Sequence, residues 1–184
     1  MTVPIEATSQ ILYTALIAAY GVERLAELVV STRNAAWSRS RGGVEHGAGH
    51  YPVMVVLHTG FLLACVAEVW LLPRDFSWAL GAPMLAVCVA AQALRWWCIT
   101  TLGPQWNTRV IVVPGLPRVT GGPYRWISHP NYVAVVAEGF ALPLVHGAWL
   151  TALGFTLANA WLLKVRLGVE DAALTALAAV EPTR

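Results

Sequence analysis

Charged residues are scarce in this sequence. Only 12% of its 184 residues are charged and the formal net charge is +2, whereas a soluble domain carries about 25% charged residues. Because the positive excess is small and no basic cluster is interleaved with aromatic residues, we expect no nucleic-acid partner. The three cysteines, Cys65, Cys88 and Cys98, lie in apolar stretches without the spacing of metal ligands. Neither a disulfide framework nor a metal site is therefore predicted.

Several common motifs are also absent. The sequence has no G-x-G-x-x-G, no G-x-x-x-x-G-K-[ST] and no H-E-x-x-H, so a Rossmann-type cofactor site and a zinc hydrolase are unsupported. No lysine or arginine precedes the first apolar run, although a secretory signal requires a basic region there. We therefore expect the first helix to be retained. We find no internal repeat, which counts against an inverted-repeat transporter.

Apolar residues dominate what is present. They make up 57% of the chain, and the mean hydropathy is +0.59. A helix needs about 20 mostly apolar residues to span a bilayer. The sequence predicts an all-α integral membrane protein, a single domain over residues 1–184, with about five transmembrane helices. We place these helices at roughly 11–30, 52–72, 78–98, 130–145 and 149–169, and expect the Ala-rich tail to form a surface helix.

A long connection separates the third and fourth predicted helices. Residues 100–129 are rich in proline and glycine, and so long an irregular segment in a small domain is often functional. Residues 108–113 are β-branched and predict a short strand, which residues 118–120 would return.

The arginines predict the orientation in the membrane. Arg74 alone falls on one side, whereas the first and third connections contain Arg33, Arg39, Arg41, Arg109, Arg118 and Arg125. The positive-inside rule then places the long connection and the C-terminus in the cytoplasm, with the N-terminus outside. Arginine outnumbers lysine eleven to one and alanine is abundant, which is typical of a GC-rich bacterial genome and predicts location in a bacterial inner membrane.

The start of the fourth helix is a candidate anion site. Pro130 suits the first helical position, and the residue before a proline avoids the helical region, so His129 should cap the helix. His129 and Tyr132 then lie at the positive end of the helix dipole. Free N–H groups there could receive an anion, such as the carboxylate of a cofactor. The alternative is a helix-start signal with interfacial aromatic residues.

Polar residues also occur within the predicted spans. Asn159, Arg166 and Glu170 share one face of the fifth helix, either as an i,i+4 ion pair between Arg166 and Glu170 or as the lining of a pocket in which Glu170 accepts hydrogen bonds from a sugar or amine. Ionisable groups at membrane depth often mark a site. The same reasoning applies to Gln92, Arg95 and Glu138. We expect Glu23, Arg24 and Glu27 to pair internally and hold the first helix to its neighbours.

Two segments together resemble a known family. Gly122–Arg125 is followed by residues 129–132, with the sequence HPNY, and then by Arg166 and the pair Glu170-Asp171. This arrangement is similar to the pattern G-x-Y-x-x-x-R-H-P-x-Y, two apolar helices, then R-x-x-x-E-E, of the isoprenylcysteine carboxyl methyltransferase family. Ser128 stands where the family usually has arginine, and Asp171 replaces the second glutamate.

The resemblance implies a helical membrane enzyme that uses S-adenosylmethionine, releases S-adenosylhomocysteine and methylates the carboxylate of a prenylcysteine-like, lipid-modified molecule. Residues 100–174 would form the methyltransferase-like part. An amphiphilic acceptor would enter from the bilayer and the donor from the cytoplasm. By this resemblance, the cofactor-binding residues are Tyr124, His129, Pro130, Asn131, Tyr132, Arg166 and Glu170.

The reaction suggests further candidates. A carboxylate acceptor needs orientation, which an arginine can give with two parallel hydrogen bonds; Arg109 is the first choice, followed by Arg95 and Arg125. If the acceptor is instead the hydroxyl of a phenolic or pyrone lipid, it must lose a proton, and Glu138 could take it if buried with a raised pKa. A different alternative is a membrane binding protein or carrier without enzymatic activity.

Overall fold

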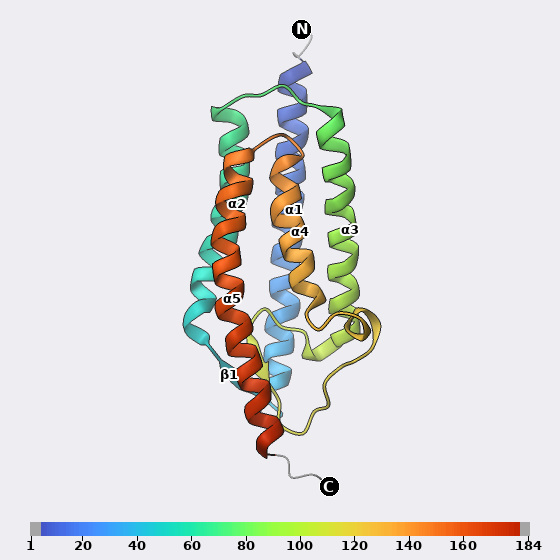
Figure 1. Cartoon of the computed structure of the whole chain (residues 1–184), viewed down its shortest axis with the longest axis vertical. Helices are drawn as coiled ribbons and strands as arrows, with labels where there is room; N and C mark the ends of the chain where they lie inside the picture. Colours follow the sequence, from blue (N-terminus) through green and yellow to red (C-terminus); the bar gives the residue numbers. More distant parts are fainter. Residues whose placement is uncertain (1–4, 181–184) are drawn as a thin grey trace.

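The chain is built from long helices that run side by side (Figure 1). The structure, a computed structural model, describes residues 5–180. Within that range it contains five α-helices: α1 (Ile5–Arg39), α2 (Tyr51–Leu71), α3 (Trp78–Leu102), α4 (Pro130–Leu144) and α5 (Trp149–Val180). The all-α prediction is confirmed.

Four helices, α2 to α5, begin within one residue of their predicted starts, and two of these starts are explained by proline. Pro52 and Pro130 lie in the first turns of α2 and α4, where a missing N–H has no intrahelical partner to lose. Ser77 precedes α3 in an extended conformation. Local chemistry was therefore enough to place these boundaries.

Helix α1 continues well past its predicted end at residue 30. Polar side chains on this extension find partners on the α3–α4 connection. Thr108 N donates to Ser31 Oγ at 3.0 Å, and Asn34 Nδ2 donates to Trp106 O at 2.8 Å. These contacts satisfy groups that would otherwise be costly to bury, so the helix persists without an apolar sequence.

Helix α5 is also longer than predicted. It runs without a break to Val180, so the Ala-rich tail is helical as predicted, but it continues α5, and the predicted end of this helix at residue 169 is wrong. The last residues of that tail, 181–184, lie outside the described range.

The predicted strand forms, but with a different partner. Strand β2 (Val110–Val112) pairs antiparallel with β1 (Val44–His46), and Glu45 faces Ile111 in the register. The predicted return strand at residues 118–120 is wrong. Three 3-10 turns complete the described elements: η1 (Ala48–His50), η2 (Gly103–Gln105) and η3 (Gly122–Arg125). The α1–α2 connection therefore takes part in the same structure as the long α3–α4 connection.

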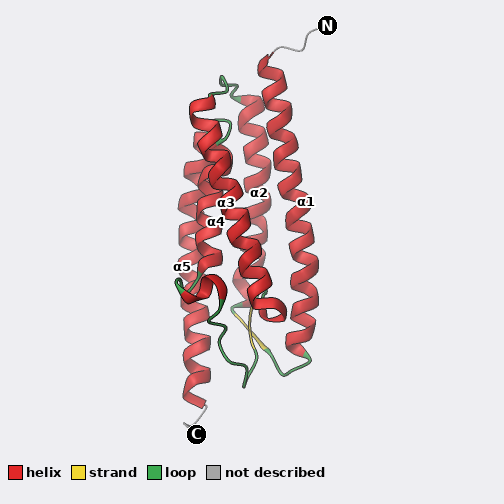
Figure 2. Cartoon of the chain, turned by 90° about the vertical axis from the view of Figure 1, so that its right-hand side faces the viewer, coloured by secondary structure: helices red, strands yellow, loops and turns green. Residues whose placement is uncertain are grey.

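Both of these connections lie at one end of the bundle, the end toward which α5 extends (Figures 1 and 2). The α2–α3 and α4–α5 connections and the start of α1 lie at the opposite end. There, the Glu68 carboxylate of α2 accepts hydrogen bonds from Leu150 N at 3.1 Å and Thr151 N at 2.7 Å. It thereby satisfies free donors in the first turn of α5.

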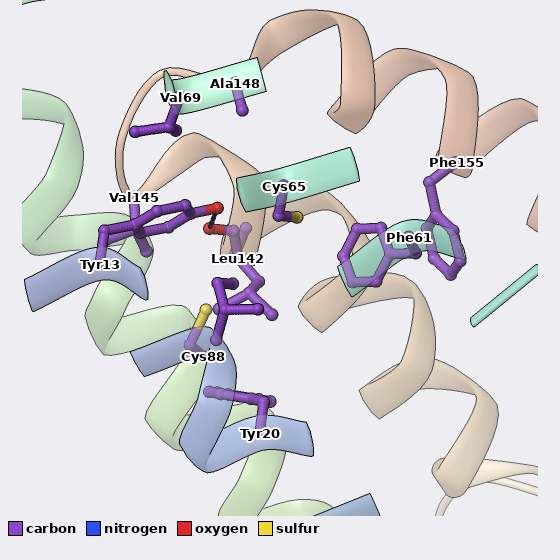
Figure 3. Close-up of a cluster of buried hydrophobic side chains, with 12 residues drawn as sticks. Tyr13, Tyr20, Phe61, Cys65, Val69, Cys88, Leu142, Val145, Ala148 and Phe155 are labelled. Atoms are coloured by element: carbon purple, nitrogen blue, oxygen red, sulfur yellow. Dashed lines mark hydrogen bonds between the residues drawn. The ribbon is translucent and has the colours of Figure 1, made fainter. Parts of the chain in front are cut away.

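The helices pack around a core of small and aromatic side chains (Figure 3). Cys65 of α2 and Cys88 of α3 are fully buried; side chains of this size let neighbouring helices approach closely. The Phe61 and Phe155 rings pack against each other with centroids 4.0 Å apart and planes tilted by 33°. Tyr13 of α1 donates to Leu142 O of α4 at 3.1 Å, which leaves its hydroxyl satisfied inside the core.

Two helical segments are long and apolar enough to cross a membrane, judged by length and composition: Ala48–Leu71 and Trp78–Gln105. Helix α4 has 15 residues. At 1.5 Å per residue this is about 22 Å, whereas the hydrocarbon core of a bilayer is about 30 Å thick. Helix α1 contains Glu23, Arg24 and Glu27 in its middle, so composition alone does not identify it as a span.

Candidate functional site

A cavity of about 500 Å³ lies at the end of the bundle that holds both connections. Residues from α1, α3, the α3–α4 connection, the start of α4 and the last part of α5 line it. The volume is within the range of sites for small molecules and cofactors. The predicted site residues that line it are Arg109, Tyr124, His129, Asn131, Tyr132, Arg166 and Glu170.

The start of α4 supplies one wall. His129 is the N-cap residue, with φ −131° and ψ 63°, and its side chain makes no capping hydrogen bond. Its ring stacks on Tyr132, with centroids 5.5 Å apart and planes 15° apart. Pro130 is fully buried behind this wall and is not among the lining residues. Its role is to fix the start of the helix.

Helix α5 supplies the facing wall, and its charged residues bond to those of α4. Arg166 Nε donates to the Tyr132 hydroxyl at 2.8 Å, and that hydroxyl donates to Glu170 Oε2 at 2.6 Å. His129 Nδ1 lies 3.7 Å from Glu170 Oε1, and its Nε2 lies 3.8 Å from Asp171 Oδ1. The start of α4 and the charged part of α5 thus face one shared cavity.

Arg166 is held from a third helix as well. The side chain is buried, and its Nη1 lies 2.9 Å from Met54 Sδ of α2. Asn159, on the same face of α5, is also buried, but it is not among the residues that line the cavity. Of the three residues predicted to share one face of α5, only Arg166 and Glu170 therefore line the cavity.

Two further polar side chains offer hydrogen-bonding groups to a ligand. Within the described part of the chain, Asn131 Oδ1 is buried and has no hydrogen-bond partner. Such a group is costly in a native structure unless a ligand or water satisfies it. The Tyr124 phenol also lines the cavity, and because burial moves its pKa further above the ordinary value, it remains a neutral hydroxyl group.

Arg109, from the long connection, also lines the cavity. It comes just before β2 and donates through Nη1 to Glu45 Oε1 at 2.6 Å. Its guanidinium carbon lies 4.0 Å from the centroid of the Tyr51 ring. Glu45 also accepts from Arg39 Nη2 at 2.9 Å. Burial acts to raise the pKa of the Glu45 carboxyl, but the hydrogen bonds from the two arginines outweigh it, and the pKa is lowered.

Arg95 and Glu138 lie in a separate charged cluster, between α1, α3 and α4. Arg95 bonds to Glu138, and Arg24 lies 3.2 Å from Glu138 and 2.9 Å from Glu27. None of these residues lines the cavity. The expected pairing of the α1 charges is present, and it extends from α1 to both neighbouring helices.

Arg125 and Ser128 also lie near the cavity. Arg125 is exposed, with its guanidinium carbon 5.8 Å from the Trp126 ring, and it is not a lining residue. Ser128, which occupies the position of the family arginine, does line the cavity. A hydroxyl is therefore present where the family pattern would place a cation.

Apart from the polar residues Ser38, Gln105, Asn107 and Arg118, the rest of the cavity lining is largely apolar. It is formed by side chains from the end of α3 and from the long connection: Leu102, Val110, Val113, Leu116 and Val119. The cavity thus combines a polar region, where opposite charges lie close together, with a region that suits a hydrocarbon group. Such a site can hold a zwitterionic molecule beside an apolar one.

Two residues that shape the site were not predicted from the sequence. Glu45 of the α1–α2 connection and Tyr51, the first residue of α2, hold Arg109. They are 64 and 58 residues away from it in the sequence, and the only local signal was the β-branched run 108–113. The pairing of that strand with β1 brings Glu45 to Arg109, which lines the cavity.

Comparison with known proteins adds to this geometry. A sequence model of the isoprenylcysteine carboxyl methyltransferase (ICMT) family matches residues 84–176. The chain is also 41% identical to a protein of Bacillus subtilis (strain 168), named "Uncharacterized protein YpbQ", over 160 residues that cover 86% of this chain and 94% of the relative. The family match includes every predicted site residue.

The family match and the two apolar helices support each other. Residues 84–176 include most of α3, all of α4 and nearly all of α5, and Trp78–Gln105 is one of the two segments able to cross a membrane. The chain is therefore related to membrane methyltransferases through the part that carries the cavity. It belongs to the isoprenylcysteine carboxyl methyltransferase family.

Proposed function

We propose that the protein is an integral membrane O-methyltransferase that uses S-adenosylmethionine. Its acceptor is the carboxylate of an amphiphilic, prenylcysteine-like molecule, and its second product is S-adenosylhomocysteine. The main support is the cross-helix arrangement of Tyr132, Arg166 and Glu170, with His129 beside them, around one cavity. These are the residues that match the cofactor motifs of the family.

We further propose that the chain is one membrane domain, with residues 100–174 as its methyltransferase-like part. All five helices cross a bacterial inner membrane, and the cavity faces the cytoplasm. The arginines support this orientation, because Arg39, Arg41 and Arg118 lie at the cavity end and Arg74 at the other. The similar protein from Bacillus subtilis is likewise bacterial.

The residues of the polar region fit the donor. S-Adenosylmethionine has a carboxylate, an ammonium group, ribose hydroxyls and an adenine ring. Arg166 can pair with the carboxylate, and Glu170 can accept from the ammonium group or a hydroxyl. The unpartnered Asn131 Oδ1 offers an additional acceptor. The start of α4 adds the positive end of a helix dipole, which favours a carboxylate.

The protein's contribution to the reaction is mainly alignment. When bound, the donor supplies a methyl group already activated on a sulfonium sulfur. Arg109 orients the acceptor carboxylate, and the apolar wall formed by the long connection holds the hydrocarbon group and excludes water. Alignment of two reactants can contribute about 7–11 kcal/mol. A carboxylate acceptor is already ionised and needs no general base.

The position of Glu138 favours a carboxylate acceptor over a lipid hydroxyl. A phenolic or pyrone hydroxyl would need a base within hydrogen-bond reach. Glu138 is bonded to Arg95 and Arg24 and is not a lining residue of the cavity. We therefore assign Arg95 and Glu138 to holding α3 and α4 together, and Arg109 to the acceptor.

Replacing Arg109 by alanine tests this function. The purified protein is given methyl-labelled S-adenosylmethionine with either N-acetyl-S-farnesylcysteine or a long-chain alkylphenol. We expect turnover of the farnesylcysteine, its loss in Arg109→Ala, and nearly unchanged affinity of that variant for S-adenosylhomocysteine. Arg41→Ala is the matched control, because Arg41 stacks on Trp37 at 4.1 Å at the same end of the bundle but does not line the cavity. Methylation of the alkylphenol alone would contradict the carboxylate assignment.

A further inference from the structure

The α1–α2 connection lies outside the residues that match the family, yet through Glu45 it contacts Arg109, a residue that lines the cavity. We propose that Glu45 is a positioning residue for the acceptor: it holds the Arg109 guanidinium in place to bind the acceptor carboxylate. This inference rests on the proposed function. It extends the site to a residue 64 positions upstream of the arginine on which it acts.

Two direct contacts and one indirect contact fix the Arg109 side chain. Glu45 Oε1 accepts from Nη1 at 2.6 Å, and the Tyr51 ring lies under the guanidinium at 4.0 Å. The third contact is indirect, since Arg39 Nη2 bonds to Glu45 Oε2 at 2.9 Å and so holds the Glu45 carboxylate. A long arginine side chain loses conformational freedom when it is fixed. Here that loss occurs during folding, before the acceptor binds.

The charges of this cluster leave Arg109 able to bind an anion. Two arginines, Arg39 and Arg109, share the single carboxylate of Glu45, so one positive charge remains unbalanced. Among the residues that the structure describes, the Arg109 guanidinium hydrogen-bonds to Glu45 through Nη1. The side chain is 34% exposed and lines the cavity. The cluster therefore presents a fixed, uncompensated cation to the cavity.

The backbone around Glu45 is itself held in place. Glu45 is the central residue of β1 and pairs with Ile111 of β2, the strand that begins one residue after Arg109. Gly47, with φ +63°, leaves no room for a Cβ, which would lie 2.7 Å from Val169 Cγ1 of α5. The connection is thus fixed between the cavity wall and α5. The Glu45 carboxylate therefore has a defined position relative to both.

The alternative is that Glu45 only stabilises the fold. A purely structural residue would, when replaced, affect donor binding and acceptor binding together. A positioning residue affects the acceptor alone, because the donor is held by α4 and α5. The relation between the acceptor KM and the donor affinity therefore distinguishes the two roles.

The test compares Glu45→Gln with the wild-type protein and with Arg41→Gln, which removes an exposed cation at the same end. N-acetyl-S-farnesylcysteine is the acceptor probe, and S-adenosylhomocysteine titrated calorimetrically reports the donor site. We expect Glu45→Gln to raise the acceptor KM roughly tenfold, as loss of one charge-assisted hydrogen bond can do, with a smaller change in kcat. Glu45→Asp, which keeps the charge, should recover part of the loss. The affinity for S-adenosylhomocysteine should not change.

The possible results separate this inference from the proposed function. If the wild-type protein methylates the probe but Glu45→Gln has the same acceptor KM as Arg41→Gln, the positioning role is wrong and the proposed function stands. If the acceptor KM rises and the affinity for S-adenosylhomocysteine falls together, Glu45 is structural and the inference is again overturned. If the wild-type protein methylates no carboxylate probe, the proposed function fails, and the inference fails with it.

Discussion

The Tyr132 hydroxyl on α4 donates a 2.6 Å hydrogen bond to Glu170 Oε2 on α5. The same hydroxyl accepts a 2.8 Å hydrogen bond from Arg166 Nε. One phenol therefore lies between two opposite charges and joins the two helices that carry the family motifs. The oxygen has no role in the apolar packing of α4, so replacing it tests the site with little change in shape.

Tyr132→Phe should weaken donor binding. The substitution keeps the ring that stacks on His129 but removes the hydrogen bonds that orient Arg166 and Glu170. Because both bonds involve a charged partner, we expect roughly a tenfold loss of S-adenosylhomocysteine affinity, measured by calorimetry. Tyr13→Phe is the matched control, since its hydroxyl bonds to Leu142 O in the core and not to the cavity residues. It should reduce thermal stability without affecting affinity; equal affinity losses in both variants would contradict the assignment.

Gly122→Ala should disrupt the attachment of η3 to α3. Gly122 has φ +53°, and a Cβ there would collide with the Thr101 side chain and lie 3.1 Å from Trp97 Nε1. Backbone strain of this kind costs about 1–3 kcal/mol. Displacement of η3 would also move Tyr124 from the cavity, so the melting temperature and S-adenosylhomocysteine affinity should both fall. Gly121→Ala is the control, because its φ is −84° and nothing lies within 4 Å of an added Cβ. No difference between the two variants would argue against this account.

Glu138→Gln should destabilise the bundle. Glu138 is bonded to Arg95 and lies 3.2 Å from Arg24. Its replacement therefore removes a carboxylate that balances the positive charge of the buried Arg95. Removing one partner of a buried pair costs about 3 kcal/mol or more, measurable as a lower denaturation midpoint in detergent. Glu23→Gln should cost less, because Glu23 is more exposed than Glu138. Loss of alkylphenol methylation at unchanged stability would instead indicate that Glu138 is a base.

The Glu45 ion pairs should make stability depend on pH in a defined direction. The pKa of Glu45 is lowered from its ordinary value of 4.5 in the folded protein. A group with a lowered pKa contributes stability above its unfolded pKa, and the contribution is lost as the pH falls through the folded value. The melting temperature of the wild type should therefore exceed that of Glu45→Gln at pH 7, and the difference should shrink below pH 4.5. A difference that stays constant down to the lowest accessible pH would contradict the ion pairing.

Local chemistry predicted the fold where boundaries are set within a few residues. Pro130 fixed the start of α4, and the apolar run after Pro52 identified α2. The extension of α1 was not predictable in this way. It depends on the bonds of Ser31 and Asn34 to the α3–α4 connection, and these partners are more than 60 residues away. A window of hydrophobicity cannot detect such contacts.

The candidate site, like the fold, was predictable where it depends on local spacing and not where it depends on distant contacts. The spacing of Arg166 and Glu170 placed both on one face of α5, and the structure brings that face to Tyr132. By contrast, the Glu45 contact with Arg109 depends on which strands pair. The β-branched run predicted a strand but not its partner, because side-chain alternation specifies which face is buried and not which strand lies alongside.

Calorimetric titration of the purified wild-type protein with S-adenosylhomocysteine tests the central claim most directly. The proposed function predicts saturable binding at one site per chain, weakened by His129→Ala and by Glu170→Ala, because both side chains line the cavity. Arg41→Ala should bind like the wild type. A carrier or other non-enzymatic membrane protein would show no saturable binding, and that result would contradict the account.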